Sequence, residues 1–134
     1  MADRVEPEII PDPDFLLCRV HHTQFNFKEN RIMSVVFSKV DQSADWSKYS
    51  TEEESVARHK TPEQIKAVVS ITAGACRELD QEVIHDPVPA GQFAGPNQAH
   101  SEIRGAKPKL VQSKLRDAIS RLWENPRFTG SLGG

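Results

Sequence analysis

The sequence has no hydrophobic run that approaches the roughly 20 residues needed to cross a bilayer, so it predicts no membrane-spanning helix. It has only two cysteines in 134 residues, Cys18 and Cys76, and they lie too far apart for a disulfide framework or a zinc site. The N-terminus also lacks the basic stretch and the apolar stretch of a secretory signal. Together these absences predict a cytoplasmic protein in a reducing compartment.

Motifs that hold cofactors are missing as well. The segment SITAGAC, residues 70–76, has one glycine and neither a GxGxxG pattern nor a Lys-Ser/Thr pair, so it is not a nucleotide-binding fingerprint. Cys76 lies among alanines and a leucine, which favours a packed, unreactive thiol. The sequence predicts no cofactor and no metal site.

The sequence has little net charge, only -2, but its charged residues are unevenly distributed. Residues 1–14 carry five acids against one base, and residues 104–127 carry seven bases against two acids. This asymmetry fits a solvated helix with an acidic leader, an acidic arm on the basic segment, or a basic face for a polyanion. No RNA-stacking aromatic motif accompanies the basic segment, so nucleic-acid binding is disfavoured.

The hydrophobic pattern predicts a single α+β domain over residues 15–126, between an acidic, proline-rich leader (1–14) and a flexible tail (127–134). The expected architecture is a small mixed sheet of about five short strands with one or two short helices and a long C-terminal helix. Strands are expected at 15–20, 31–38, 67–72, 82–87 and 99–104, the first two forming a hairpin. Residues 41–50 are interpreted as a loop.

Three helices are expected. Thr51 precedes three glutamates, which favours a capped helix start, and Pro62 fits a single turn before the strand at 67–72. Residues 73–81 would form a short helix joining two strands as a βαβ unit, which makes those strands parallel. Residues 109–124 place most of their apolar side chains on one helical stripe, which Pro126 ends.

The stretch QEVIHDPVPAGQFAGPNQAHSEIRG, residues 81–105, holds the candidate catalytic groups. His100 and Glu102 lie two residues apart on one predicted strand, so they share a face, and His85 ends the strand before. If the two strands are neighbours, His85 can lie close to this pair. Histidine suits general acid–base chemistry. Two histidines and a carboxylate also match open metal sites, but the spacing fits no specific metal motif.

Four further polar residues are candidate binding groups. Asp86 and Asn97 flank the proline- and glycine-rich loop, Arg104 ends the strand after it, and Arg19 lies near the end of the first strand. The remaining histidines, His21, His22 and His59, are assigned to surface positions.

Several short motifs are similar to a group of small bacterial proteins. They are Arg19-Val20, the Ser-Val-x-Phe run at 34–37, the Thr-x-Glu-Glu-Ser run at 51–55, and the HDP…NxAH…G pattern at 85–105. The resemblance covers most of residues 15–106. It implies a common domain and implies no particular activity. The looser order Arg19, Ser34, Glu102 is similar to that of ADP-ribosyltransferases, but the motif flanks of that fold are absent.

The main hypothesis is a non-enzymatic binding or accessory module of a multi-protein bacterial system, with a protein partner. It depends on the exposed loop, the uneven charge and the absence of a complete catalytic motif. The alternative is a small hydrolase or transferase for a phosphate- or ribose-containing substrate, with one histidine as base and Glu102 orienting it. Binding of a nucleic acid through residues 107–127 is a minor third possibility.

Overall fold

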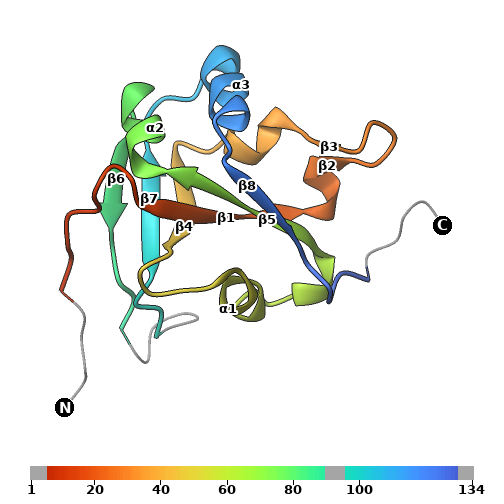
Figure 1. Ribbon diagram of the computed structural model, residues 1–134, viewed down its shortest axis with the longest axis horizontal. Helices are drawn as coiled ribbons and strands as arrows, with labels where there is room; N and C mark the ends of the chain where they lie inside the picture. The colour runs from red at the N-terminus through yellow and green to blue at the C-terminus, as the bar shows by residue number, and fades with distance from the viewer. Residues whose placement is uncertain (1–5, 90–95, 130–134) are drawn as a thin grey trace.

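The computed structural model describes residues 6–89 and 96–129, and in this part of the chain it shows a six-stranded antiparallel sheet and a two-stranded ribbon (Figure 1). The sheet has the order β6-β7-β4-β1-β5-β8. The elements, with η for a 3-10 helix, are β1 (Phe15–His21), η1 (His22–Gln24), β2 (Phe25–Asn26), β3 (Arg31–Ile32), η2 (Ser34–Phe37), β4 (Asp41–Trp46), α1 (Glu52–Ala57), η3 (Pro62–Gln64), β5 (Ile65–Thr72), α2 (Ala73–Glu78), β6 (Glu82–His85), β7 (His100–Arg104), α3 (Lys109–Asp117) and β8 (Arg121–Glu124).

The α+β class is confirmed, and so are several of its elements. Thr51 accepts a hydrogen bond from Glu54 N, and the Glu54 side chain accepts one from Thr51 N, a capping box that starts α1. The turn at Pro62–Gln64 and the strand that follows it, β5, also form as expected. The strand expected at 99–104 is β7, and the short helix expected at 73–81 is α2.

The prediction of a mixed sheet is wrong, because every neighbouring pair of strands in the main sheet is antiparallel. The strands on either side of α2 are not neighbours: β1, β4 and β7 lie between β5 and β6. One edge of β5 is occupied by β1 over its whole length and the other by β8. The strand after α2 therefore pairs with β7 at the far edge of the sheet.

The long C-terminal helix is also wrong. The helix α3 ends at Asp117, and residues 121–124 form β8 on the edge of β5. The pairing of the C-terminal segment with β5 begins where Ser120 N donates to Ser70 O at 2.8 Å. Pairing with β8 satisfies the backbone groups on that edge of β5, which would otherwise be exposed.

The second predicted strand and the loop after it exchange roles. Residues 34–37 form η2, which directs both Val36 and Phe37 into the core. Neighbouring residues on a strand point to opposite faces, so a strand could not bury both on one side. The sheet strand is instead β4, whose polar sequence DQSADW alternates Asp41, Ser43 and Asp45 on one face with less polar residues on the other. The expected hairpin of 15–20 with 31–38 does not form, since β1 pairs with β4 and β5.

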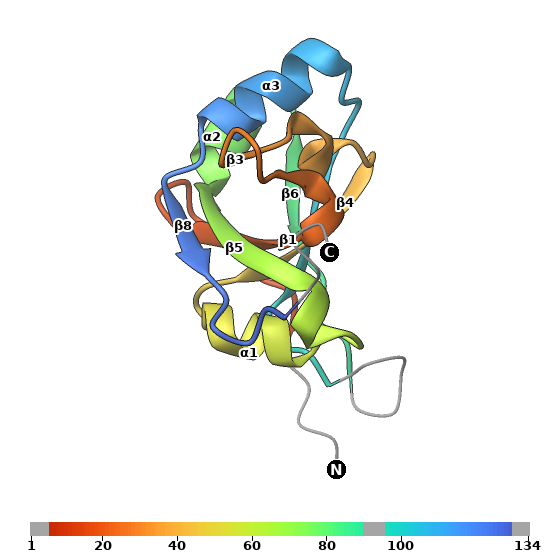
Figure 2. The same ribbon diagram turned by 90° about the vertical axis from the view of Figure 1, so that its right-hand side faces the viewer.

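The sheet has a main core on one face and a smaller cluster on the other. Figures 1 and 2 show α2 and α3 on one side of the sheet and α1 on the opposite side. The main core includes Leu16, Trp46, Val69 and Ile103 and packs beneath α2, α3 and η2. The α1 side has a cluster of five apolar residues: Leu17, Val56, Ile65, Val68 and Trp123. None of the helices in the described residues is long and apolar enough to pass through a lipid bilayer.

Residues 6–14, which the sequence assigns to a leader, lie against the sheet and α2. Ile10 is fully buried in the main core. The carbonyls of Asp12 and Asp14 accept hydrogen bonds from Gly74 N and Ala73 N, both at 2.9 Å. The N-terminal segment is thereby joined to the start of α2 along several consecutive residues.

Candidate functional site

His85 is a buried structural group, with 3% of its surface exposed. Its Nδ1 accepts a hydrogen bond from Glu8 N at 3.0 Å, so its Nε2 carries the proton and donates to Gln98 O at 2.7 Å. The ring stacks on Tyr49 and meets the edge of Trp46. Both ring nitrogens are therefore used to hold the N-terminal segment and the chain just before β7.

The structure does not bring His85 together with His100 and Glu102. His85 pairs with Ser101, and paired residues of an antiparallel ladder point to the same face. His100 and Glu102 flank Ser101, so they point to the opposite face of the sheet. His100 Nδ1 lies 2.9 Å from Asp86 O, and Glu102 forms an ion pair with Arg104.

The predicted binding residues separate into two groups. Arg104 and Asp86 lie at the exposed β7 side, where Arg104 pairs with Glu102 and Asp41. Asn97 and Arg19 instead converge on one buried carboxylate, that of Asp45: Asn97 Nδ2 donates to Asp45 Oδ1 at 2.9 Å, and Arg19 lies 3.9 Å from Oδ2. The central loop residues 90–95 lie outside the described residues.

Asp45 is the centre of a polar network beneath α1. Ser55 Oγ donates to its Oδ2 at 2.6 Å and Arg58 at 3.1 Å. Burial by itself would raise the pKa of Asp45, but the hydrogen bonds from Ser55 and Asn97 and the charges of Arg58 and Arg19 outweigh it, so the pKa lies below its usual value. Asp45 is thus an ionised group that fixes the two arginines.

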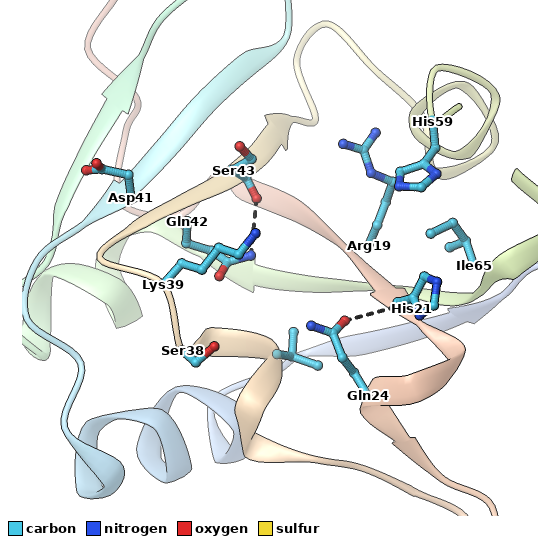
Figure 3. A pocket seen from close by; sticks show the side chains of 11 residues that line it. Arg19, His21, Gln24, Ser38, Lys39, Asp41, Gln42, Ser43, His59 and Ile65 are labelled. Atoms are coloured by element: carbon cyan, nitrogen blue, oxygen red, sulfur yellow. Dashed lines mark hydrogen bonds between the residues drawn. The ribbon is translucent and has the colours of Figure 1, made fainter. Parts of the chain in front are cut away.

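A cleft opens where β1 and β4 separate. Within the described residues, β1 pairs with β4 only at Leu16–Trp46 and Leu17–Asp45, although each strand continues for four residues beyond this point. The cleft has a volume of about 230 Å³ and lies between the separated segments (Figure 3). Because the ladder is open there, Ser43 and Gln42, which alternate along β4, both line it.

The cleft has an excess of positive charge. Arg19 and His59 lie beside each other on one wall, and Lys39 lies on the opposite wall, near Gln42 and Ser43 (Figure 3). Asp41 is the one acid among the lining residues, and its carboxylate already pairs with Arg104 at 3.0 Å. The lining residues in full are Arg19, His21, Gln24, Val36, Ser38, Lys39, Asp41, Gln42, Ser43, His59 and Ile65.

The hydrogen bonds of the cleft histidines decide which can donate to a ligand. His21 uses both nitrogens, since Nδ1 accepts from Thr23 N and Nε2 contacts Gln64 Oε1 at 3.1 Å. His59 Nδ1 accepts from Thr61 N at 3.1 Å, which leaves its proton on Nε2, and no described residue hydrogen bonds to that nitrogen. Burial and the nearby Arg19 charge lower the pKa of His59. His59 therefore favours the neutral form, with its Nε2–H available as a donor.

Arg19 also retains donors. Its Nη1 donates to Ser55 O at 2.8 Å, whereas no described residue accepts a hydrogen bond from its Nε or Nη2. On the other wall, Gln42 carries an Oε1 that is buried and accepts no hydrogen bond from any described residue. The cleft thus offers several donors and one unsatisfied acceptor.

Part of the basic C-terminal segment is engaged in contacts within the fold. Lys107 is buried and donates to the carbonyls of Val40, Ile103 and Gly105. Arg116 pairs with Asp117 and Arg121 lies 3.9 Å from Glu52. These contacts reduce the charge that a polyanion would meet.

Sequence reasoning named Arg19 but missed Lys39, Gln42 and His59. The sequence places His59 at the surface and Gln42 in a loop. It gives no sign of the segments that lie beside these two residues in the fold. The two cysteines are free and buried, and burial raises the pKa of both thiols, that of Cys76 to about 12. Across residues 6–89 and 96–129, no three His, Cys, Asp or Glu side chains gather as a metal ligand set.

Comparisons with known proteins gave no match: no family model fits the chain, and no curated protein and no solved structure is significantly similar to it. The resemblance to small bacterial proteins therefore stays a prediction.

Proposed function

We propose that this protein is a non-enzymatic binding module whose cleft between β1 and β4 holds a small anionic ligand. One observation carries the proposal: Arg19 and Lys39 face the cleft from opposite walls, and the one acid among its lining residues is already paired with Arg104. Arg19 keeps two donors that no described residue uses, and Lys39 adds a second positive charge, so the cleft favours an anion.

The enzymatic alternative has less support from the geometry. It requires His85, His100 and Glu102 to face one substrate, and the strand register directs His85 away from the other two. His85 would also have to give up its bonds to Glu8 N and Gln98 O before it could transfer a proton.

The test is calorimetric titration of the protein with sulfate and with inorganic phosphate at low ionic strength. We expect Lys39→Ala to weaken binding about tenfold, because a hydrogen bond to a charged group contributes about 1.5–3 kcal/mol. Lys28→Ala is the matched control, since Lys28 is exposed and does not line the cleft. Equal binding by both variants, or no binding by the unmodified protein, would refute the site.

We further propose a cytoplasmic, accessory role with a protein partner that contacts residues 33–40. This segment forms part of the cleft wall and exposes three apolar side chains: Met33, Val35 and Val40. Val40→Glu would place a charge in such a contact. A partner captured from the native host by the unmodified protein should be lost with Val40→Glu. It should be kept with Val88→Glu, because Val88 lies after β6, outside residues 33–40, and bridges Asn97 instead. Capture that is identical with both variants counts against this surface.

A further inference from the structure

Resting on the proposed function, we infer that the ligand of the cleft is a phosphomonoester of a small hydroxylated molecule, rather than inorganic phosphate or a simple carboxylate. Three features of the cleft lead to this class: its charge, its size, and the buried acceptor of Gln42 that lacks a partner.

The charge fits a dianion. Arg19 offers Nε and Nη2, a pair of donors in the fixed fork that matches two oxygens of a phosphate. Lys39 provides a second full charge from the opposite wall. A phosphomonoester carries a charge of about −1.5 to −2 near neutral pH and three acceptor oxygens, so its phosphate can contact both walls at once. A monocarboxylate has two oxygens and one charge and would leave part of this donor set unused.

The size exceeds that of a phosphate group alone. One molecule of liquid water occupies about 30 Å³, so the cleft of about 230 Å³ has the volume of roughly seven or eight waters. A phosphate group, counted as at most four water-sized oxygens, fills about half of that space or less. The lining also includes the buried side chains of Val36 and Ile65, which suit the carbon skeleton of an organic group.

Gln42 indicates that this organic group carries a hydrogen-bond donor. Its Oε1 is buried and lacks a partner among the described residues, and a buried acceptor without a partner destabilises the protein. A ligand hydroxyl would satisfy it. Since Gln42 is on the Lys39 wall of the cleft, the hydroxyl would lie close to the phosphate, as in a polyol or sugar phosphate.

The experiment compares four probes by calorimetry: inorganic phosphate, ribose 5-phosphate, ribose and succinate. We expect ribose 5-phosphate to bind at least tenfold tighter than inorganic phosphate, and ribose not to bind measurably. Gln42→Met, which keeps the size of the side chain and removes its acceptor, should weaken ribose 5-phosphate about tenfold and leave inorganic phosphate unchanged. Gln98→Ala, an exposed side chain away from the cleft, should change neither.

The possible failures are distinguishable. If inorganic phosphate binds as tightly as ribose 5-phosphate, or if succinate binds tighter than both, the phosphomonoester class is overturned while the anion site stands. If Lys39→Ala and the unmodified protein respond identically to every probe, the proposed function itself fails. A thermal melt of Gln42→Met that matches the unmodified protein shows that the variant is folded. If that melt is lost, Gln42→Glu replaces it: its added charge should abolish binding of both phosphates, and unchanged binding would overturn the inference.

Discussion

Arg19 is held in position by groups that do not line the cleft. Its Nη1 is fixed by Ser55 O, and Asp45 beneath it supplies the opposite charge. Asp45 in turn depends on Ser55, Arg58 and Asn97 for its own hydrogen bonds. The orientation of one cationic side chain is therefore set by a network drawn from α1, β4 and the segment before β7.

Asp45→Asn should destabilise the protein strongly. Removing one partner of a buried ion pair costs about 3–5 kcal/mol, because the remaining charges are left uncompensated, and only 3% of Asp45 is exposed. Asp41→Asn is the control, an exposed carboxylate paired with Arg104 whose loss should lower the free energy of unfolding by about 1 kcal/mol or less. Urea denaturation measures both variants, and equal effects would contradict a central role for Asp45.

His59 should couple anion binding to proton uptake. Its pKa is lowered by burial first and then by the charge of Arg19, with His21 and Lys60 acting in the same direction. The free protein thus favours the neutral ring, and its stability falls as the pH drops below the ordinary value of 6.5 towards the folded pKa. An anion in the cleft raises the pKa again, so affinity should fall as the pH rises through this region.

Sulfate is the probe for this coupling, because its charge does not change between pH 5 and 8. Titrations in two buffers of different ionisation enthalpy should show proton uptake by the unmodified protein and by His22→Gln, and none by His59→Gln. Proton uptake that persists in His59→Gln would assign the effect to another group.

At the scale of elements, the C-terminal region shows why the pattern of apolar residues was insufficient. Val111, Leu115, Ala118 and Ile119 have helical spacing, and the next apolar residues continue it at 122 and 123. Residues 121–124 also fit a short strand. They form a strand rather than a helix because the edge of β5 is free to pair with them, and the sequence of residues 109–124 gives no information about that edge. Similarly, β4 has a polar face because Asp45 is buried within a network, so it lacks the apolar alternation of an ordinary strand.

Because residues 121–124 form a strand, Leu122 and Trp123 should contribute unequally to the free energy of unfolding. On β8 they point to opposite faces: Trp123 packs on the α1-side cluster, and Leu122 is 40% exposed. Trp123→Ala should lower the free energy of unfolding by about 2–4 kcal/mol, and Leu122→Ala by about 1 kcal/mol. Chemical denaturation tests this; a helix through 124 would instead place both side chains on the buried stripe, and similar losses would favour it.

At the scale of the whole molecule, the N-terminal segment belongs to the structural unit. Ile10 enters the main core, Glu8 pairs with Lys48 at 2.7 Å and contacts Tyr49, and Trp46 Nε1 donates to Asp14 at 3.0 Å. The composition of residues 1–14 suggests an extended leader, and proline does keep it non-helical. Residues 6–14 are attached to the domain by the buried side chain of Ile10 and by several backbone hydrogen bonds. A count of acids and prolines reveals neither of these contacts.

Ile10→Ala should therefore destabilise the protein by about 2–4 kcal/mol, since the side chain is fully buried. Its neighbour provides the control: Ile9 is 89% exposed, and Ile9→Ala should stay within about 0.5 kcal/mol of the unmodified protein. The free energies of unfolding from denaturant titrations compare the two. A small loss for Ile10→Ala would mean that the segment leaves the core readily in solution.

The α+β class, the start of α1 and the strand β5 were all within reach of the sequence, because each depends on local chemistry or on a compact apolar run. Strand order was not, since it depends on which edges are free after the other strands have paired. The cleft was missed for the same reason: His59 and Lys39 come from segments that only the completed sheet brings near Arg19.

The separation of β1 from β4 has a mechanical consequence. Among the described residues, the strands β6, β7 and β4 form one ladder and β1, β5 and β8 another, and the two ladders are joined by the pairs at Leu16 and Leu17 and by the adjacent bond from Ser47 N to Phe15 O. We expect so short a junction to act as a hinge, about which one half of the sheet twists relative to the other. A bound molecule that contacts Arg19 on one half and Lys39 on the other would join the halves at the open end. Binding of a ligand in the cleft would then change the angle between the two ladders. A partner protein that contacts both ladders would bind the occupied and the unoccupied forms with different affinity.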